Sequence, residues 1–157
     1  MTRDPTPIWC FALVVVRQDD KFLVIQERKH GQLWYLPAGR VERTEDFFTA
    51  ARREAEEEAG FRVRLTGIVR MEHTPVPGDR ARLRIVFEGV PEEPIEHPQG
   101  GQDALAAAWV TPAEAAELPL RAEELPALFR HVANEGSMPI QVLTREDAPY
   151  PIPSCDS

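Results

Sequence analysis

The segment from residue 44 to residue 60 most constrains the fold, because it has the pattern of one amphipathic helix with an unusual edge. At 100° per residue, Phe47, Phe48 and three alanines fall within about 120° of one another and form a core-facing stripe. Thr44 is predicted as the N-cap, and Gly60 as the residue that ends the helix. The segment therefore predicts a helix whose apolar side is narrow and built largely of alanine.

Three glutamates gather at one edge of that stripe. Glu54, Glu57 and Glu58 have the spacing i, i+3, i+4 and fall on an arc of about 100° beside the buried face. Like charges at this spacing destabilise a helix, and a run of glutamates is usually a solvated helix face. The cluster is tolerated if divalent cations share it, since Mg²⁺ and Mn²⁺ prefer carboxylate oxygen. Taken alone, the run leaves two interpretations, a solvated face or a metal site.

The spacing of the surrounding residues decides between the two. Residues 39–61 fit the pattern G-x5-E-x7-R-E-U-x-E-E-x-G-U, where U is apolar, at Gly39, Glu45, Arg53, Glu54, Ala55, Glu57, Glu58, Gly60 and Phe61. Seven of these positions require one residue type, so a chance match in a chain of this length is on the order of one in a million. The match is therefore too specific to be accidental.

This pattern is the signature of the Nudix hydrolases, and the resemblance extends over about residues 8–135. Residues 36–39, Leu-Pro-Ala-Gly, stand where many members have Leu-Pro-Gly-Gly. The resemblance implies an α/β fold of the Nudix type, an α/β/α sandwich with a mixed β-sheet. It also implies hydrolysis of a nucleoside diphosphate linked to another group, with Mg²⁺ as cofactor and Mn²⁺ as an alternative. The nearest resemblance is to members that act on nucleoside diphosphates.

The same resemblance implies catalytic and metal-binding roles for the motif residues. Glu57 and Glu58 are expected to be the principal metal ligands, and the Gly39 carbonyl a further ligand. Glu54 is expected to be either another ligand or the base that activates water. Asp103, just before the last predicted strand, is a second candidate base, with an ordinary strand-edge acid as the alternative.

Supporting and substrate-binding residues are expected around the motif. Glu45 and Arg53 are implied to form an ion pair within it. Arg28 ends the second predicted strand, where its guanidinium could grip a phosphate bidentately. Arg84 is a weaker candidate, because alternate arginines on a strand usually form its solvent face. Trp34 could stack on a nucleobase, with a core position as the alternative.

The rest of the chain predicts one domain followed by an arm. Apolar or alternating runs predict strands at residues 8–17, 22–26, 33–36, 61–72, 80–87 and 104–110. A turn is predicted at residues 75–78, a short helix from Pro112 and another helix over residues 122–133. The proline-rich end predicts an extended arm, so residues 1–137 are assigned to the Nudix domain and residues 138–157 to the arm. A homodimer in which the arm crosses onto a partner subunit is left open.

Composition limits the partners. A net charge of −8 with no basic tract argues against a long nucleic acid as ligand, whereas a small nucleotide can bind through a divalent cation. The longest apolar run, residues 8–16, is too short to cross a bilayer and lacks the features of a secretion signal. We therefore expect no membrane association. The two cysteines form no metal or disulfide motif, which favours a cytoplasmic location.

Two functions from different classes agree with the motif. The first is a Mg²⁺-dependent pyrophosphohydrolase acting on oxidised nucleotides, ADP-ribose or sugar nucleotides. The second is a non-catalytic Nudix-fold module that binds a nucleotide in order to regulate another process. Such modules commonly lose acids from the motif, whereas this chain keeps Glu54, Glu57 and Glu58. The sequence therefore favours the enzyme.

Overall fold

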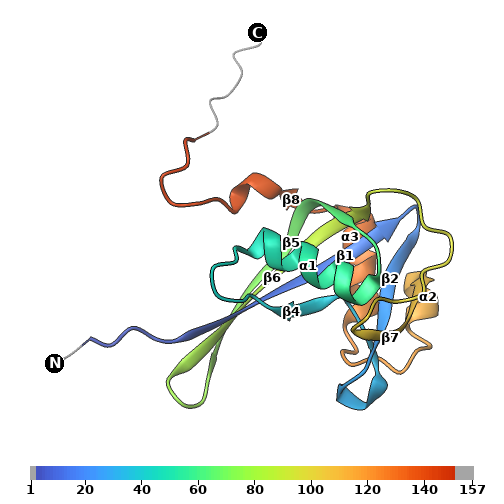
Figure 1. Cartoon of the computed structure of the whole chain (residues 1–157), viewed down its shortest axis with the longest axis horizontal. Coiled ribbons are helices and arrows are strands. Elements are labelled where there is room, and N and C mark those ends of the chain that lie inside the picture. The colour runs from blue at the N-terminus through green and yellow to red at the C-terminus, as the bar shows by residue number, and fades with distance from the viewer. Residues whose placement is uncertain (1–2, 151–157) are drawn as a thin grey trace, which may run out of the picture.

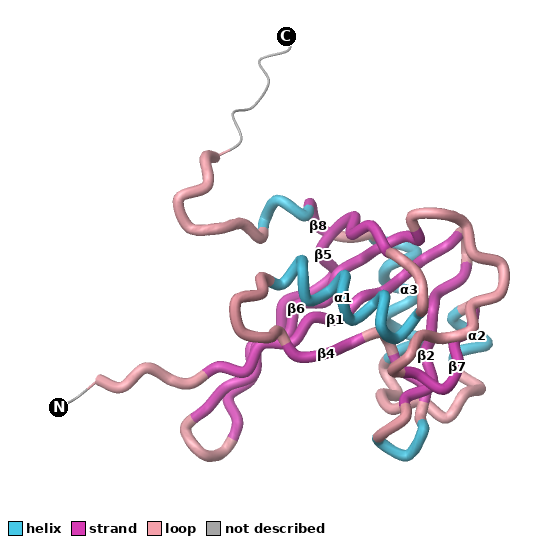
Figure 2. Tube along the Cα trace, viewed as in Figure 1, coloured by secondary structure: helices cyan, strands magenta, loops and turns pink. Residues whose placement is uncertain are grey.

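The computed structural model describes residues 3–150 and shows a mixed sheet with helices on both faces (Figures 1 and 2). The strands are β1 (Ile8–Gln18), β2 (Lys21–Glu27), β3 (Trp34–Tyr35), β4 (Ala38–Arg40), β5 (Val63–Val76), β6 (Arg80–Pro91), β7 (Ala104–Val110) and β8 (Met138–Pro139). The α-helices are α1 (Phe47–Ala59), α2 (Pro112–Ala115) and α3 (Leu125–Glu135). Short 3-10 turns cover His30–Gln32 and Ile140–Val142. The predicted α/β/α sandwich with a mixed sheet is confirmed.

Strand β1 is the centre of the sheet. It runs parallel to β6, pairs antiparallel with β4, and leads through a tight hairpin into β2, which also pairs with β3 and β7. Its alternate side chains face opposite layers: Ala12, Val14 and Val16 pack under α1, and Leu13 and Val15 pack under α3. All five are buried, as expected for a strand with a continuous apolar run and a helix over each face.

Helix α1 lies close to the sheet because its buried stripe is made of alanine. The fully buried residues of this helix are Ala50, Ala51, Ala55 and Ala59. Only Phe47 and Phe48, at its first turn, add bulk, and the ring of Phe48 lies 5.6 Å from that of Phe87 on β6. Small side chains let the helix backbone approach the strands, so polar residues at the edge of the stripe come near the sheet as well.

Helix α3 covers the opposite face. The ring of Phe129 stacks on that of Phe22 with 4.6 Å between centroids and 5° between planes. Leu125 and Val132 complete the buried side of this helix. No helix within residues 3–150 is both long and apolar enough to cross a bilayer.

The start of α1 differs from the prediction. Asp46, not Thr44, is the N-cap, and its Oδ1 accepts a hydrogen bond from the Thr49 N–H at 2.7 Å. Thr44 has a φ of 70° and lies in the preceding turn. The end agrees with the prediction, because Gly60 adopts the left-handed conformation with a φ of 83°. As a result Glu45 lies before the helix, where its side chain is free to turn back toward it.

The hairpin between β5 and β6 is longer than predicted. Pro75 and Val76 belong to β5 and pair with Ala81 and Arg80, so the turn covers residues 77–79 instead of residues 75–78. Proline is tolerated there because this end of β5 lies beyond its pairing with β8 and is a free edge of the sheet.

The predicted arm begins on its own domain. Strand β8 pairs antiparallel with Gly67 and Ile68 of β5. Ile140 and Leu143 then pack against the core on the α1 side. The boundary at residue 137 stays a prediction, and residues 151–157 of the arm lie outside the described part of the chain.

The aromatic stack under α3 generates a stability prediction. Phe129→Ala removes a fully buried ring from the layer that faces away from α1, and we expect the free energy of unfolding to fall by about 3–5 kcal/mol. Chemical denaturation measures the change, with exposed Arg130→Ala on the same helix as the control. A loss below about 1 kcal/mol for Phe129→Ala would contradict the packing described.

Candidate active site

Arg53 connects the charged residues of the motif. Its Nε and Nη2 donate to the two carboxylate oxygens of Glu45 at 2.7 and 3.0 Å, which makes a bidentate ion pair. Its Nη1 donates to Glu54 Oε1 at 2.7 Å and to Glu57 Oε2 at 3.1 Å. The hydrogen bond from Arg53 lowers the pKa of Glu45. One guanidinium thus joins the loop before α1 to two of the three clustered carboxylates.

Glu54 lies against the backbone of β4. A Cβ atom at position 39 would fall on the Glu54 carboxylate, so any larger residue there would displace that carboxylate. Burial raises the pKa of Glu54 even though Arg53 donates a hydrogen bond to it. The structure therefore brings together Gly39 and Glu54, two of the predicted metal ligands.

Glu58 is the most strongly perturbed carboxylate of the cluster. Its Oε2 accepts a hydrogen bond from the Ala38 N–H at 2.8 Å. Burial raises the pKa of Glu58 to about 8, and the negative charges of Glu54, Glu27 and Asp103 contribute in the same direction. Because burial and these charges disfavour the ionised form, the Glu58 carboxyl keeps a proton at neutral pH unless a cation replaces it.

The loop between β6 and β7 closes the C-terminal end of α1. The N–H groups of Gly101 and Asp103 donate to the carbonyls of Glu58 and Glu57 at 2.8 and 3.1 Å. These bonds satisfy carbonyls that a helix end leaves free, and a Cβ at position 101 would collide with the Glu57 carbonyl. The loop thereby holds the Asp103 carboxylate near the cluster, where its charge raises the pKa of Glu54 and Glu58.

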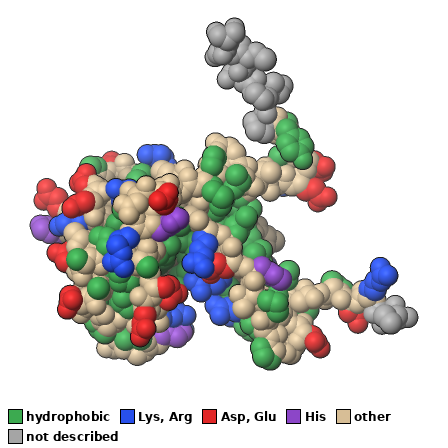
Figure 3. Space-filling model, turned by 180° about the vertical axis from the view of Figure 1, so that it is seen from behind, with side chains coloured by type: hydrophobic (Ala, Val, Ile, Leu, Met, Phe, Trp, Pro, Cys, Tyr) green, Lys and Arg blue, Asp and Glu red, His purple; other side chains and the backbone are tan. Residues whose placement is uncertain are grey.

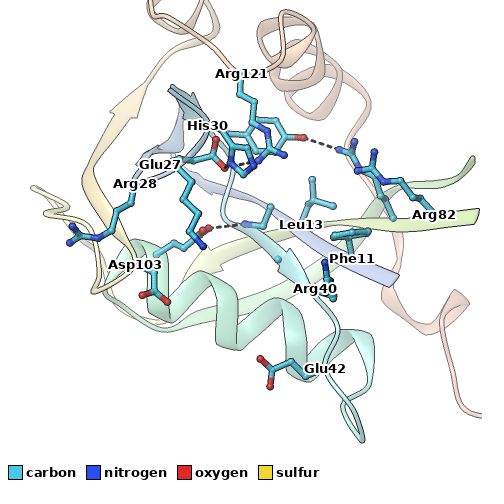
Figure 4. Close-up of a pocket in the computed structure, with 16 residues that line it drawn as sticks. Phe11, Leu13, Glu27, Arg28, His30, Arg40, Glu42, Arg82, Asp103 and Arg121 are labelled. Carbon is cyan, nitrogen blue, oxygen red and sulfur yellow. Dashed lines mark hydrogen bonds and ion pairs between the residues drawn. The ribbon is translucent and has the colours of Figure 1, made fainter. Parts of the chain in front are cut away.

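The cluster opens onto a cleft of about 790 Å³. Gly39, Glu58 and Asp103 line it on the α1 side. Six cationic side chains line it as well: Arg28, Lys29, Arg40, Arg82, Arg84 and Arg121. Figure 4 shows Asp103 on one side of the cleft and Arg40 and Arg82 on the other. In the space-filling view, Lys and Arg side chains gather beside a hollow in the surface (Figure 3). Such a cleft suits an anionic ligand that brings a divalent cation with it.

Only some of the predicted substrate-binding residues line the cleft. Arg28 lines the cleft, and its Nε donates to the Gln102 carbonyl at 3.1 Å. Arg84 also lines it, in spite of its position among alternate arginines on β6. Trp34 is not among the lining residues and packs against the core on the α3 side. Its neighbour Tyr35, a buried member of the same core cluster, lines the cleft instead.

Residues missed by the sequence analysis also line the cleft. Glu27, at the end of β2, forms an ion pair with Arg121, and their side-chain atoms lie 2.6 Å apart. The guanidinium carbon of Arg121 lies 5.0 Å from the centroid of the Tyr35 ring. An acidic residue at the end of an otherwise apolar strand could have been noticed in the sequence. Nothing in the sequence indicates that its partner is the arginine 94 residues later.

The residues fit a hard divalent cation by their chemistry. Their oxygens are of the kind that Mg²⁺ prefers, the raised pKa of Glu58 marks a place that favours a positive charge, and the Gly39 backbone lies against Glu54. In the described residues no three His, Cys, Asp or Glu side chains converge as they stand, and Arg53 engages Glu54 and Glu57. The metal ligand set therefore stays a prediction.

Comparison with known proteins supplies the family. A family model described as the NUDIX domain matches residues 8–131. The chain belongs to the Nudix family. A MutT-like protein from Streptomyces ambofaciens is 34% identical over 107 residues, which cover 66% of this chain and 64% of the relative. The human 8-oxo-dGDP phosphatase NUDT18 is 34% identical over 122 residues, which cover 74% of this chain and 36% of the relative. This Nudix chain thus spans less than two thirds of the length of either relative.

Solved structures agree on the fold. A Nudix hydrolase from Nitrosomonas europaea superposes with a TM-score of 0.69 at 23% identity, over 91% of this chain and 99% of that one. An ADP-ribose pyrophosphatase from Streptococcus suis gives a TM-score of 0.64 at 19% identity, over 83% and 95% of the two chains. At these sequence identities the comparison shows a shared fold only.

The raised pKa of Glu58 predicts how stability depends on pH in metal-free buffer. This carboxyl has a pKa of about 8 in the folded protein and an ordinary pKa of 4.5 in the unfolded chain, so the folded state binds more protons between these pH values. The free energy of unfolding therefore falls as pH rises through that window. Glu58→Gln removes this contribution, so at pH 8 with EDTA we expect the variant to be more stable than the wild type by roughly 1–4 kcal/mol.

Chemical denaturation at pH 5 and pH 8 measures this difference. Glu56→Gln, on the exposed side of α1, is the matched control and is expected to follow the wild type. If Glu58→Gln lost as much stability between the two pH values as the wild type does, Glu58 would not be the cause of the pH dependence.

Proposed function

We propose that this Nudix protein is a Mg²⁺-dependent pyrophosphohydrolase that cleaves a nucleoside diphosphate linked to another group. The observation that carries the proposal is the Glu58 carboxyl, buried among other acids in the wall of a cleft that also presents Arg40 and Arg82. Guanidinium groups bind phosphate oxygens, and a divalent cation held by carboxylates binds them from the other side. A diphosphate is the ligand that uses both.

The proposed ligands of the cation are the carboxylates of Glu54, Glu57 and Glu58 and the Gly39 carbonyl. When bound, Mg²⁺ or Mn²⁺ neutralises phosphate oxygens and lowers the pKa of a water molecule. Arg53 has a complementary role, because its bonds to Glu54 and Glu57 keep both carboxylates at the same edge of α1 in the metal-free protein.

The proton of the attacking water must pass to a carboxylate. Asp103 lines the cleft, whereas Glu54 lies behind Gly39 and is engaged by Arg53. The backbone of Asp103 is anchored to the end of α1, which places this residue beside the cluster. We therefore favour Asp103 as the base and Glu54 as a metal ligand.

The first substrate to test is an oxidised guanine nucleoside diphosphate. The human relative is named 8-oxo-dGDP phosphatase and shares 34% of the aligned residues with this chain. ADP-ribose and nucleotide sugars are the other substrates in the proposed class, and a small nucleotide agrees with the size of the cleft and with the net charge of −8.

A turnover screen tests the proposed function. The panel contains 8-oxo-dGDP, ADP-ribose, a UDP-sugar and a dinucleoside polyphosphate, each with Mg²⁺ or with EDTA, and products are separated by chromatography. We expect at least one to be hydrolysed with Mg²⁺ and none with EDTA. Tight nucleotide binding without hydrolysis of any member would favour the non-catalytic module.

Substitution of the two candidate bases gives a second test. Asp103→Asn is expected to lower kcat by roughly 10²–10⁴-fold and to remove the acidic limb of the pH–rate profile. Glu54→Gln is expected to weaken Mg²⁺ binding, so part of its lost activity returns at high metal concentration. Rates across pH and Mg²⁺ concentration separate the two, with Glu56→Gln as the control. An Asp103→Asn profile like that of the wild type would assign the base to Glu54.

A further inference from the structure

A carboxylate that the proposed reaction does not use is buried in the wall of the cleft. Glu27 is 9% exposed and lines the cleft. Its Oε1 accepts a hydrogen bond from Nη1 of Arg121 at 2.6 Å and lies 3.6 Å from His30 Nδ1. Its Oε2 is also buried and has no hydrogen-bond partner within residues 3–150. Leaving a buried carboxylate oxygen without a donor is unfavourable, so this atom marks a place where a ligand can supply the donor.

Arg121 is held beside that oxygen from several directions. The ion pair with Glu27 fixes one nitrogen, and the ring of Tyr35 lies against the guanidinium plane. The backbone N–H of Arg121 donates to the Trp34 carbonyl at 3.0 Å, which fastens the segment between α2 and α3 to β3. A guanidinium carries five N–H donors. The bond to Glu27 uses one of these donors, and Figure 4 shows Glu27, His30 and Arg121 grouped at one end of the cleft.

The charges of this group argue against a phosphate as its ligand. A phosphate bound to Arg121 would lie next to the negative charge of Glu27. Arg40 and Arg82 also line the cleft, and Figure 4 shows them away from Glu27, so they suit phosphate oxygens better. A neutral ligand edge that offers a donor next to an acceptor satisfies both Oε2 of Glu27 and the free N–H groups of Arg121.

We propose that Glu27 and Arg121 recognise the nucleobase of the substrate and select one with a carbonyl next to an N–H, as guanine has. In this arrangement O6 of the base accepts from Arg121, while N1–H or the amino group donates to Glu27 Oε2. Adenine has no carbonyl oxygen and forms the weaker pairing. The proposal rests on the proposed function only in taking the ligand to be a nucleotide. It makes both residues determinants of specificity outside the motif.

Binding of nucleoside monophosphates without metal tests the proposal. Calorimetric or NMR titration in EDTA compares GMP with AMP, which carry the same phosphate and ribose. We expect the wild type to bind GMP about tenfold more tightly than AMP. Glu27→Gln keeps only one acceptor oxygen, which Arg121 takes, so the preference should be lost. Arg121→Lys keeps the charge but not the planar fork, and should also reduce the ratio.

Glu123→Gln, an exposed acid near Arg121, is the matched control and should keep the wild-type ratio. The ratio of two affinities is unaffected by a partial loss of folded protein, and thermal melting verifies that each variant folds. A ratio near one in the wild type, a ratio unchanged in both variants, or no binding of either nucleotide would overturn the proposal. Failure of every substrate in the turnover screen would refute the proposed hydrolase while leaving this ratio measurable, so the two failures are distinguishable.

Discussion

The site depends on keeping three carboxylates beside a hydrophobic core, and Arg53 makes this possible. Like charges three and four residues apart repel one another, and burial strengthens the repulsion. Arg53 offsets it for Glu54 and Glu57, and its bidentate pair with Glu45 keeps the guanidinium from turning toward solvent. Glu58 receives a backbone N–H instead of a guanidinium, and its pKa rises to about 8. The carboxyl that has no guanidinium partner is thus the one that lines the cleft.

The apolar side of α1 determines where the carboxylates at its edge lie. A stripe of alanines lets the helix approach the sheet, and glycine at position 39 lets β4 approach the helix edge. Larger residues at either place would separate Glu54 from the strand. The same closeness excludes water from the carboxylates, which is why burial is the main cause of the raised pKa of Glu54 and Glu58. The small residues of α1 and β4 therefore account both for the close packing of the helix on the strands and for the raised pKa of the two carboxyls.

The fold and the motif could be predicted from local patterns, whereas other parts depend on contacts that a sequence does not display. The helix end at Gly60 follows from one residue type, but Thr44 and Asp46 are both capable caps, and only the turn conformation decides between them. Trp34 and Tyr35 are neighbouring aromatic residues that contact the same core cluster, and nothing in the sequence distinguishes the one that lines the cleft. Pro75 extends a strand because the strand is an edge there.

Glu27 and Arg121 line the cleft but come from elements outside the motif. Glu27 and Arg121 are 94 residues apart and meet because the segment after α2 bonds to β3, which pairs with β2. Arg121 is held in the cleft by a backbone bond to β3 and by side-chain contacts with β2 and β3, whereas Glu58 is held by α1 and β4. Substitutions in this segment can therefore change what the cleft recognises without moving Glu58 or Gly39. Under the two proposals, such a fold separates the choice of nucleobase from the handling of the diphosphate.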